Sequence, residues 1–205
     1  MNTILTREAF ENAIRLHDLM MESDAIFEDG NDRTEEVKEL MKNPENWIRD
    51  DYDQFIDSLN KSKRKCFLTM YTPEEFERDG VSTYQLRGFS IGYALKPMPD
   101  GNVDIISVHN NEPDVHNIGD LMLSLAKANG GTQLDHFDGK LSDIYSRNGF
   151  EEYDRWKFND EMAPGDWDYE KYGRPDIVLR RIRKGEIDEW VIKMKNFQRR
   201  LDFID

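Results

Sequence analysis

Side chains that can exchange a proton are concentrated on two segments with the composition of β-strands. Asp104 and His109 belong to the strand-like segment 103–109, and Asp135 and His136 belong to the next one along the chain. A carboxylate or an imidazole held in such a place can act as a general acid or base. Because side chains alternate along a regular strand, Asp104 and His109, five positions apart, are expected to point to opposite faces.

Metal and disulfide chemistry have little support in the sequence. The chain has one cysteine, Cys66, and no Cys/His pairing has the spacing of a zinc site. A lone cysteine favours a reducing compartment. The N-terminus lacks a basic region followed by a long apolar run, and no stretch approaches the roughly 18 apolar residues of a membrane span. We therefore expect no metal, no membrane partner and a cytoplasmic location.

The charge of the chain limits its partners. Lysine and arginine number 28 against 42 aspartates and glutamates, which gives a formal net charge of −14. Binding to nucleic acid requires clustered cations that neutralise phosphates, so no direct nucleic acid contact is expected. The acidic surface either maintains solubility or attracts a cationic small molecule or a basic protein.

The length of 205 residues fits a single domain over 1–205. We divide it into a helical, acidic N-terminal part (1–60), a core (61–182) and a helical C-terminal tail (183–205). Hydrophobic periodicity predicts the elements within these parts. Helices are expected over 6–21, 34–42, 45–60, 118–128, 141 to about 148, and 184–205. Strands are expected over 66–71, 83–95 as a strand pair element with Gly88 and Gly92 as bulge or close-packing points, 103–109, 132–137, 150–157 and 175–182, with a polar connection over 73–80.

The order of these elements carries a family resemblance. A strand pair, a buried strand, a Gly-containing turn into a helix, a strand, and a helix ending in Tyr-x-x-x-Gly-Phe together resemble the GNAT N-acyltransferase family over about 65–182. The most specific fragment is Asp143–Phe150, which reads DIYSRNGF. The resemblance implies an α/β (α+β) fold with a mixed, mostly antiparallel central sheet flanked by helices.

The resemblance also implies a reaction, the transfer of an acetyl or other acyl group from acyl-CoA to a primary amine. Tyr145 matches the family tyrosine whose hydroxyl protonates the departing thiolate. Such a tyrosine can also simply pack its ring under the sheet. For the amine, we choose His109 as the general base because it lies at the strand end nearer the turn, with Asp104, Asp135 and His136 as the other candidates. The alternative for His109 is an ordinary hydrogen-bonded histidine.

The phosphate-binding turn of the family aligns with the segment 114–119. A glycine-rich turn at a helix N-terminus exposes N–H groups that bind a pyrophosphate. Gly119 matches the family pattern, and Asn117 replaces the first glycine but tolerates a left-handed backbone. Asp114 stands where the family has Arg or Gln, which places a carboxylate beside an anion site. The expected contacts to acetyl-CoA are Val108, Asn117, Ile118, Gly119 and Asp120.

Two further segments bear on partners. The connection 159–176 is long, aromatic and acidic, so it either covers a cleft and attracts a cationic acceptor or packs against the sheet edge. The basic tail, with which we group Arg180 and Arg181, either docks on the N-terminal helices or covers an acidic patch of a second copy in a homodimer.

Two functions are therefore compatible with the sequence. The first is an N-acyltransferase acting on a small amine or a protein lysine. The alternative is a catalytically inactive GNAT-fold binding or inhibitor protein that acts through protein–protein contacts, of a kind that a mobile element can carry.

Overall fold

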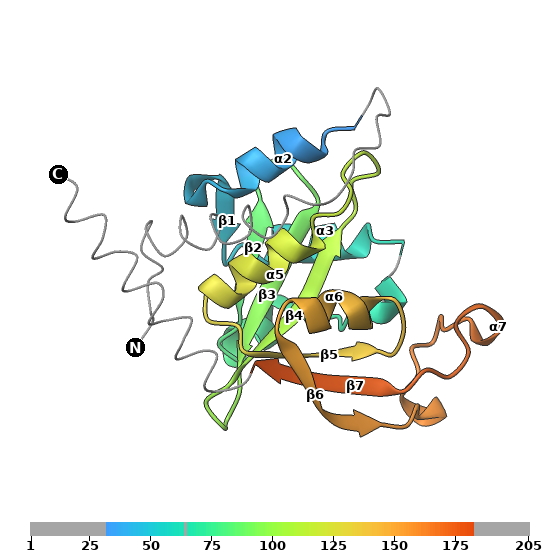
Figure 1. Cartoon of the computed structure of the whole chain (residues 1–205). Coiled ribbons are helices and arrows are strands. Elements are labelled where there is room, and N and C mark those ends of the chain that lie inside the picture. Colours follow the sequence, from blue (N-terminus) through green and yellow to red (C-terminus); the bar gives the residue numbers. More distant parts are fainter. Residues whose placement is uncertain (1–31, 64, 183–205) are drawn as a thin grey trace.

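The computed structural model describes residues 32–63 and 65–182 (Figure 1). These residues contain a seven-stranded sheet with the order β1-β2-β3-β4-β5-β7-β6. All neighbouring strands are antiparallel except β4 and β5, which are parallel. The expected mixed, mostly antiparallel sheet flanked by helices is confirmed. The helix predicted over 6–21 and the tail over 184–205 lie outside the described residues.

The elements follow the turn and cap residues of the sequence. α4, for example, begins with a capping box between Thr72 and Glu75. The strands are β1 (Trp47–Arg49), β2 (Ser82–Leu86), β3 (Ile91–Pro97), β4 (Val103–Asn110), β5 (Gln133–Phe137), β6 (Phe150–Trp156) and β7 (Ile177–Ile182); the α-helices are α2 (Thr34–Met41), α3 (Tyr52–Asn60), α4 (Pro73–Arg78), α5 (Gly119–Ala128), α6 (Leu141–Arg147) and α7 (Tyr169–Tyr172).

Helices cover the two faces of the sheet with separate apolar clusters. α2, α5 and α6 contribute to the larger cluster, in which Leu121 and Leu125 of α5 are fully buried together with Tyr93 of β3. α3 and α4 contribute to the smaller one, where Phe55 and Phe76 lie with Ala94. We call these the α5 face and the α3 face. Each is held by the burial of apolar side chains, at about 25 cal/mol per Å² removed from water.

The parallel strands β4 and β5 are joined only at their beginnings. Their ladder has one register pair, Asp104 opposite Gln133. Thr132 ties the strands together at this point, because its N–H donates to the Val103 carbonyl at 2.9 Å. Beyond this pair the two strands share no ladder, and Figure 1 shows β5, β6 and β7 running at a steep angle to β2, β3 and β4. The backbone of β4 and β5 past this point is therefore not engaged between the two strands.

A bulge in β4 changes which side chains share a face. Ser107 has a φ of 53°, and the register against β3 shifts between Gly92, opposite His109, and Ala94, opposite Ile106. One extra residue on the bulged strand reverses the alternation beyond it. Asp104 and His109 therefore both lie on the α3 face, and the expectation of opposite faces, which assumed a regular strand, is wrong.

The segment 45–60, predicted as one helix, contains a strand and a helix. Trp47, Ile48 and Arg49 pair with β2 as the edge strand β1, and α3 begins only at Tyr52. The break between them is local, because Asp50 has a φ of 57° and the side chain of Asp51 caps α3.

Two shorter segments also differ from expectation. The strand predicted over 66–71 is absent, and Lys65–Phe67 forms a 3₁₀ turn in which the Phe67 ring contacts three aromatic rings instead of a strand neighbour. The polar connection over 73–80 contains α4, whose Phe76 is fully buried under the sheet. A single apolar residue among charged ones gave too weak a period to predict that helix.

Candidate functional site

The segment before α5 begins the candidate site. Asn117 has a φ of 51°, which its residue type tolerates, and Gly119 starts the ten-residue helix. The first N–H groups of an α-helix have no partner within the helix and carry its positive end. A Cβ atom built on Gly119 would meet nothing closer than Ile144 Cγ2 of α6, at 3.9 Å, so the helix start is not crowded by side chains. This turn therefore has the geometry of an anion site.

The preceding loop is held by the start of α2. The Thr34 hydroxyl accepts a hydrogen bond from the His116 N–H at 2.8 Å, and the Arg33 N–H donates to the Asp114 carbonyl at 2.9 Å. The Arg33 guanidinium lies 4.0 Å from the Asp114 carboxylate. Asp114, the unfavourable residue of the sequence pattern, is therefore beside a cation. Glu112 is turned toward the backbone of Ser90, whose N–H donates to it at 2.6 Å.

The helix that carries Tyr145 lies against this turn, because α5 and α6 are fastened together. Arg147 of α6 donates to the carboxylate of Asp120 in the first turn of α5, with Nε to Oδ1 at 2.8 Å, and Asn148 donates to the same carboxylate. Within the part of the chain that the structure describes, the Tyr145 hydroxyl has no hydrogen-bond partner. Burial, and to a lesser extent the charge of Asp135, raises the pKa of Tyr145 to about 12. The hydroxyl is protonated at neutral pH and is available as a donor.

His136 of β5 packs against Tyr145 and is fixed in one tautomer. The centroids of the His136 and Tyr145 rings lie 4.7 Å apart. His136 Nε2 accepts a hydrogen bond from Arg180 Nε at 2.9 Å, so the proton is on Nδ1, which donates to the Phe137 carbonyl at 2.8 Å. Burial is the main reason that the pKa of His136 is lowered, and the neighbouring Arg180 charge adds to it. His136 is therefore a neutral support for the tyrosine rather than a free base.

His109 lies on the α3 face, where it contacts α3. Its Nδ1 donates to the Ser107 carbonyl at 2.9 Å, and its Nε2 accepts from the Ser58 hydroxyl at 2.7 Å. The side chain is 5% exposed and packs edge-on against Phe55. Burial lowers its pKa to about 4. The structure therefore places this residue in a satisfied polar network and does not bring it together with Tyr145.

Two carboxylates occupy the α3 face where β4 and β5 meet. Asp104 is opposite Gln133, and Asp135 follows two residues later on the same face of β5. Burial raises the pKa of Asp104, and the Gln133 hydrogen bond opposes that rise. Asp135 reaches solvent, but crowding by protein atoms raises its pKa, and the charge of Asp104 raises it further. Asp135 is thus the carboxylate whose charge is felt at Tyr145.

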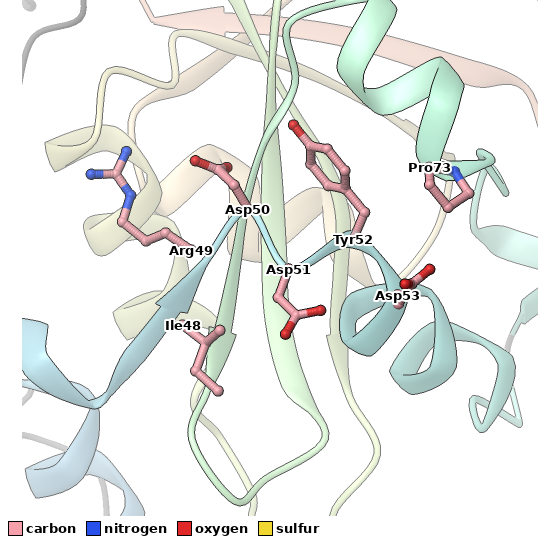
Figure 2. A pocket seen from close by; sticks show the side chains of 7 residues that line it. All are labelled: Ile48, Arg49, Asp50, Asp51, Tyr52, Asp53 and Pro73. Atoms are coloured by element: carbon pink, nitrogen blue, oxygen red, sulfur yellow. The ribbon is translucent and has the colours of Figure 1, made fainter.

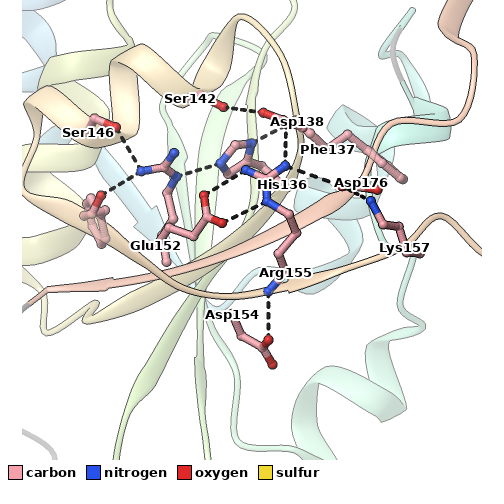
Figure 3. A network of polar contacts seen from close by, with 12 residues as sticks. His136, Phe137, Asp138, Ser142, Ser146, Glu152, Asp154, Arg155, Lys157 and Asp176 are labelled. Carbon is pink, nitrogen blue, oxygen red and sulfur yellow. Dashed lines mark hydrogen bonds and ion pairs between the residues drawn. The ribbon is translucent and has the colours of Figure 1, made fainter.

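The segment 159–176 packs on the end of β5. Trp167, 6% exposed, lies 4.8 Å from the Phe137 ring and 5.3 Å from the Phe67 ring. Figure 3 shows that Arg155 of β6, just before the segment, forms ion pairs with Asp138 and with Asp176 at the end of the segment. Of the two roles expected for this segment, the contacts are those of packing against the sheet.

Sequence reasoning missed two arginines. Arg33 was not predicted as a site residue because it precedes α2 in a charged stretch. Arg180 was not predicted because it was grouped with the basic tail. Arg180 is only 7% exposed and points into the protein, so it cannot cover an acidic patch of a second copy. Its alternation with the buried residues of β7 was the available signal, but an arginine on a strand is more often exposed.

A surface depression lies away from this site. Figure 2 shows it between β1 and α3, with a volume of about 510 Å³ and a lining formed by residues 48–53 and Pro73. Its lining contains three aspartates and none of the candidate site residues. Asp51 in this lining is already the N-cap of α3.

The comparisons with known proteins give no relative. Neither the models of protein families nor the curated proteins match this chain. Among the described residues, no helix is long and apolar enough to cross a membrane. The same residues contain no group of three His, Cys, Asp or Glu side chains that could hold a metal ion. The assignment of function therefore depends on the geometry of the site.

Proposed function

We propose that the chain is a GNAT-type N-acyltransferase, which transfers an acetyl or other acyl group from acyl-CoA to a primary amine. One observation carries this proposal. The first turn of α5 is fastened to the end of α6, the helix that carries Tyr145, and Tyr145 packs against β5, whose ladder with β4 ends after one register pair. This combines an anion site, a proton donor and unengaged strand backbone, which are the three elements that the reaction needs.

The residues around α5 fit the phosphates of acyl-CoA. The N–H groups of the first turn, beginning at Gly119, would hold the pyrophosphate, with Asn117 and Ile118 shaping the approach. Asp120 is neutralised by Arg147, and Asp114 has Arg33 beside it. When bound, acyl-CoA supplies the activated acyl carbonyl as a thioester. Backbone N–H groups of β4 near Val108 would polarise that carbonyl.

The remaining groups would move protons. The attacking amine forms the C–N bond as the C–S bond breaks, and Tyr145 donates its proton to the departing sulfur. The amine must lose a proton, and we assign Asp135 as its base, on the face of β5 opposite to His136 and Tyr145, because its charge contributes to the raised pKa of Tyr145. Asp135 replaces His109, the base expected from the sequence, because His109 already accepts a hydrogen bond from Ser58. A carboxylate with a raised pKa is a better base than an ordinary one.

The chemistry of the α3 face favours a cationic acceptor. Asp104 and Asp135 lie there together, and the whole chain carries a net charge of −14. A primary amine is protonated at neutral pH, and carboxylates attract it before one of them removes its proton. The acceptor class that fits is therefore a small cationic amine or a protein lysine.

The proposal is tested by titration with acetyl-CoA and by one tyrosine variant. Calorimetry should show binding, and acetyl-CoA should raise the melting temperature because it binds only the folded state. Tyr145→Phe should bind acetyl-CoA as the wild type does but lose about a hundredfold in kcat. Tyr153→Phe, which alters an exposed tyrosine on β6, is the matched control. No binding at millimolar acetyl-CoA would reject the proposal.

A second function, a GNAT-fold binding or inhibitor protein without catalysis, is favoured by a different observation. β6 is an edge of the sheet and exposes Tyr153 and Trp156, the latter at 55%. Large exposed aromatic residues are typical of protein interfaces. A pull-down compared between wild type and Trp156→Ala tests this function. A stoichiometric partner lost in the variant, together with no acyl transfer by the wild type, would favour it over the enzyme.

A further inference from the structure

Arg180 of β7 is a buried cation with an unusual set of partners. Its side chain donates to His136 Nε2 at 2.9 Å, to the Ser146 hydroxyl at 2.9 Å and to the Phe150 carbonyl at 3.1 Å. All three acceptors are neutral, and Arg180 forms no ion pair with any carboxylate in the described part of the chain. Glu152 is opposite Arg180 in the β6–β7 register, but its carboxylate binds Arg155.

Keeping such a group is costly for stability. A buried charge that contacts no carboxylate loses its hydration and recovers only part of that loss through neutral hydrogen bonds. An apolar residue at this strand position would avoid the cost. The groups that Arg180 contacts should therefore explain why this position is an arginine.

Those groups surround one side chain. His136 lies against the Tyr145 ring, Ser146 is the next residue of α6, and Phe150 begins the strand that follows α6. One planar guanidinium therefore fixes the strand below Tyr145, the helix that carries it and the chain that leaves that helix. Figure 3 shows the labelled His136 and Ser146 as parts of this network.

The contact with His136 depends on arginine in particular. A guanidinium donates and never accepts, so His136 Nε2 must be unprotonated where it meets Arg180. Lysine could supply the charge, but it lacks the flat fork that holds several acceptors in one plane. The charged groups around His136 come from three places: Arg180 of β7, Glu152 and Arg155 of β6, and Asp138 after β5.

We infer that Arg180 is a positioning residue for Tyr145: it locks the ring of His136 in one tautomer and holds α6, so that the tyrosine hydroxyl keeps one position beside β5. This inference rests on the acyl-transfer function proposed above. It adds a second layer of residues, from β5 and β7, to the reaction that α5 and α6 would perform.

The test compares Arg180→Lys with Arg181→Lys, its exposed neighbour on β7. In Arg180→Lys, kcat for acyl transfer should fall about tenfold to a hundredfold, because small displacements of a reacting group are costly. KM for acetyl-CoA should change less than about twofold, since the α5 turn is untouched. Nitrogen chemical shifts of the His136 ring should move from a single tautomer to a mixture. Arg181→Lys should leave all three readouts unchanged.

Ser146→Ala gives a second variant that keeps Arg180 and removes one exposed acceptor. It should lower kcat about threefold while the His136 tautomer persists. The inference is overturned if Arg180→Lys keeps wild-type kcat and a single tautomer, or if kcat falls only in proportion to the folded fraction. If the wild type itself transfers no acyl group, the proposed function fails and this role fails with it, an outcome that differs from an active wild type with an active Arg180→Lys.

Discussion

His109 and His136 begin with the same local arrangement and end with different surroundings. Each lies near the end of a central strand and donates from Nδ1 to a backbone carbonyl, Ser107 in one case and Phe137 in the other. Their Nε2 atoms differ, because His109 accepts from the hydroxyl of Ser58 and His136 accepts from a guanidinium. Burial lowers the pKa of both imidazoles.

The difference shows what a histidine contributes in each region. Around His109 the chain of donors runs from Asn111 to Ser90, from Ser90 to Ser58 and from there to the ring, which leaves every member satisfied. Such a closed network binds α3 to β4 and offers nothing to a substrate. His136 instead supports Tyr145, whose hydroxyl is left available. The sequence pattern is the same for both histidines, and the neighbouring elements decide which one lies beside a reactive group.

The region around His109, which we call the closed region, should tolerate added side-chain volume less well than the region around His136 and Tyr145, which we call the open region. A Cβ atom on Gly92 would lie 2.6 Å from the Tyr84 carbonyl oxygen and 2.9 Å from His109 Cε1. Gly92→Ala should therefore lower the free energy of unfolding by more than about 3 kcal/mol, since backbone cannot move aside easily. Gly165→Ala, with no atom within 4 Å of its Cβ, is the control. Urea denaturation measures both, and equal stabilities would contradict the packing described here.

The same region should make stability depend on acid. The pKa of His109 is lowered from 6.5 to about 4, so the unfolded chain takes up the proton first as the pH falls. The His109 contribution is fully present above about pH 6.5 and is lost between there and pH 4, by about 3 kcal/mol. Urea denaturation at several pH values should show a steeper acid loss in the wild type than in His109→Gln. His116→Gln, which alters an exposed histidine, should keep the wild-type slope.

Substitutions in the open region should instead lower the acyl-transfer activity. Asp135→Asn should reduce kcat/KM for acyl transfer about a hundredfold, equivalent to about 2.7 kcal/mol, because the amine loses its base. Asp104→Asn, on the same face, should lose much less. Steady-state kinetics with a primary amine provide the measurement. If the two variants were equally impaired, the carboxylates would act only by attracting the amine.

The smallest expected effect compares the two hydroxyl groups attached to these networks. Ser58→Ala would leave His109 Nε2 buried without a donor, which should cost about 2 kcal/mol of stability. Ser146 is exposed, so Ser146→Ala should cost well under about 1 kcal/mol. Thermal and urea unfolding of both variants give the comparison, and a larger loss in Ser146→Ala would reverse the assignment of the two regions.

Much of the scaffold could be predicted from local patterns. The helix expected over 118–128 is α5, and the strand expected over 103–109 is β4, because each has a long apolar period and clear flanking turns. Short elements were less predictable. β1 has three residues and forms only because β2 pairs with it, which is information that the segment 45–60 does not contain. A helical period and a strand period cannot be separated over so few residues.

The candidate site divides in the same way. Gly119 and Tyr145 could be selected from a sequence pattern, but their mutual position depends on the contact between Asp120 and Arg147, 27 residues apart. For Arg180 the alternation along β7 was too weak a signal, because its burial depends on β7 lying between β5 and β6. Asp135 was named as a weaker base than His109, since only the fold reveals that Ser58 already occupies His109.

The bulge at Ser107 has a consequence for related chains. Side chains along a strand repeat every two residues, and the extra residue in β4 reverses this repeat between Asp104 and His109. Deleting one residue there would restore regular alternation and turn the imidazole away from α3 toward the opposite layer. Sequences aligned to this chain should therefore keep their length through 104–109 even where residue identities drift, and a gap in that interval would mark a protein with its histidine on the other side.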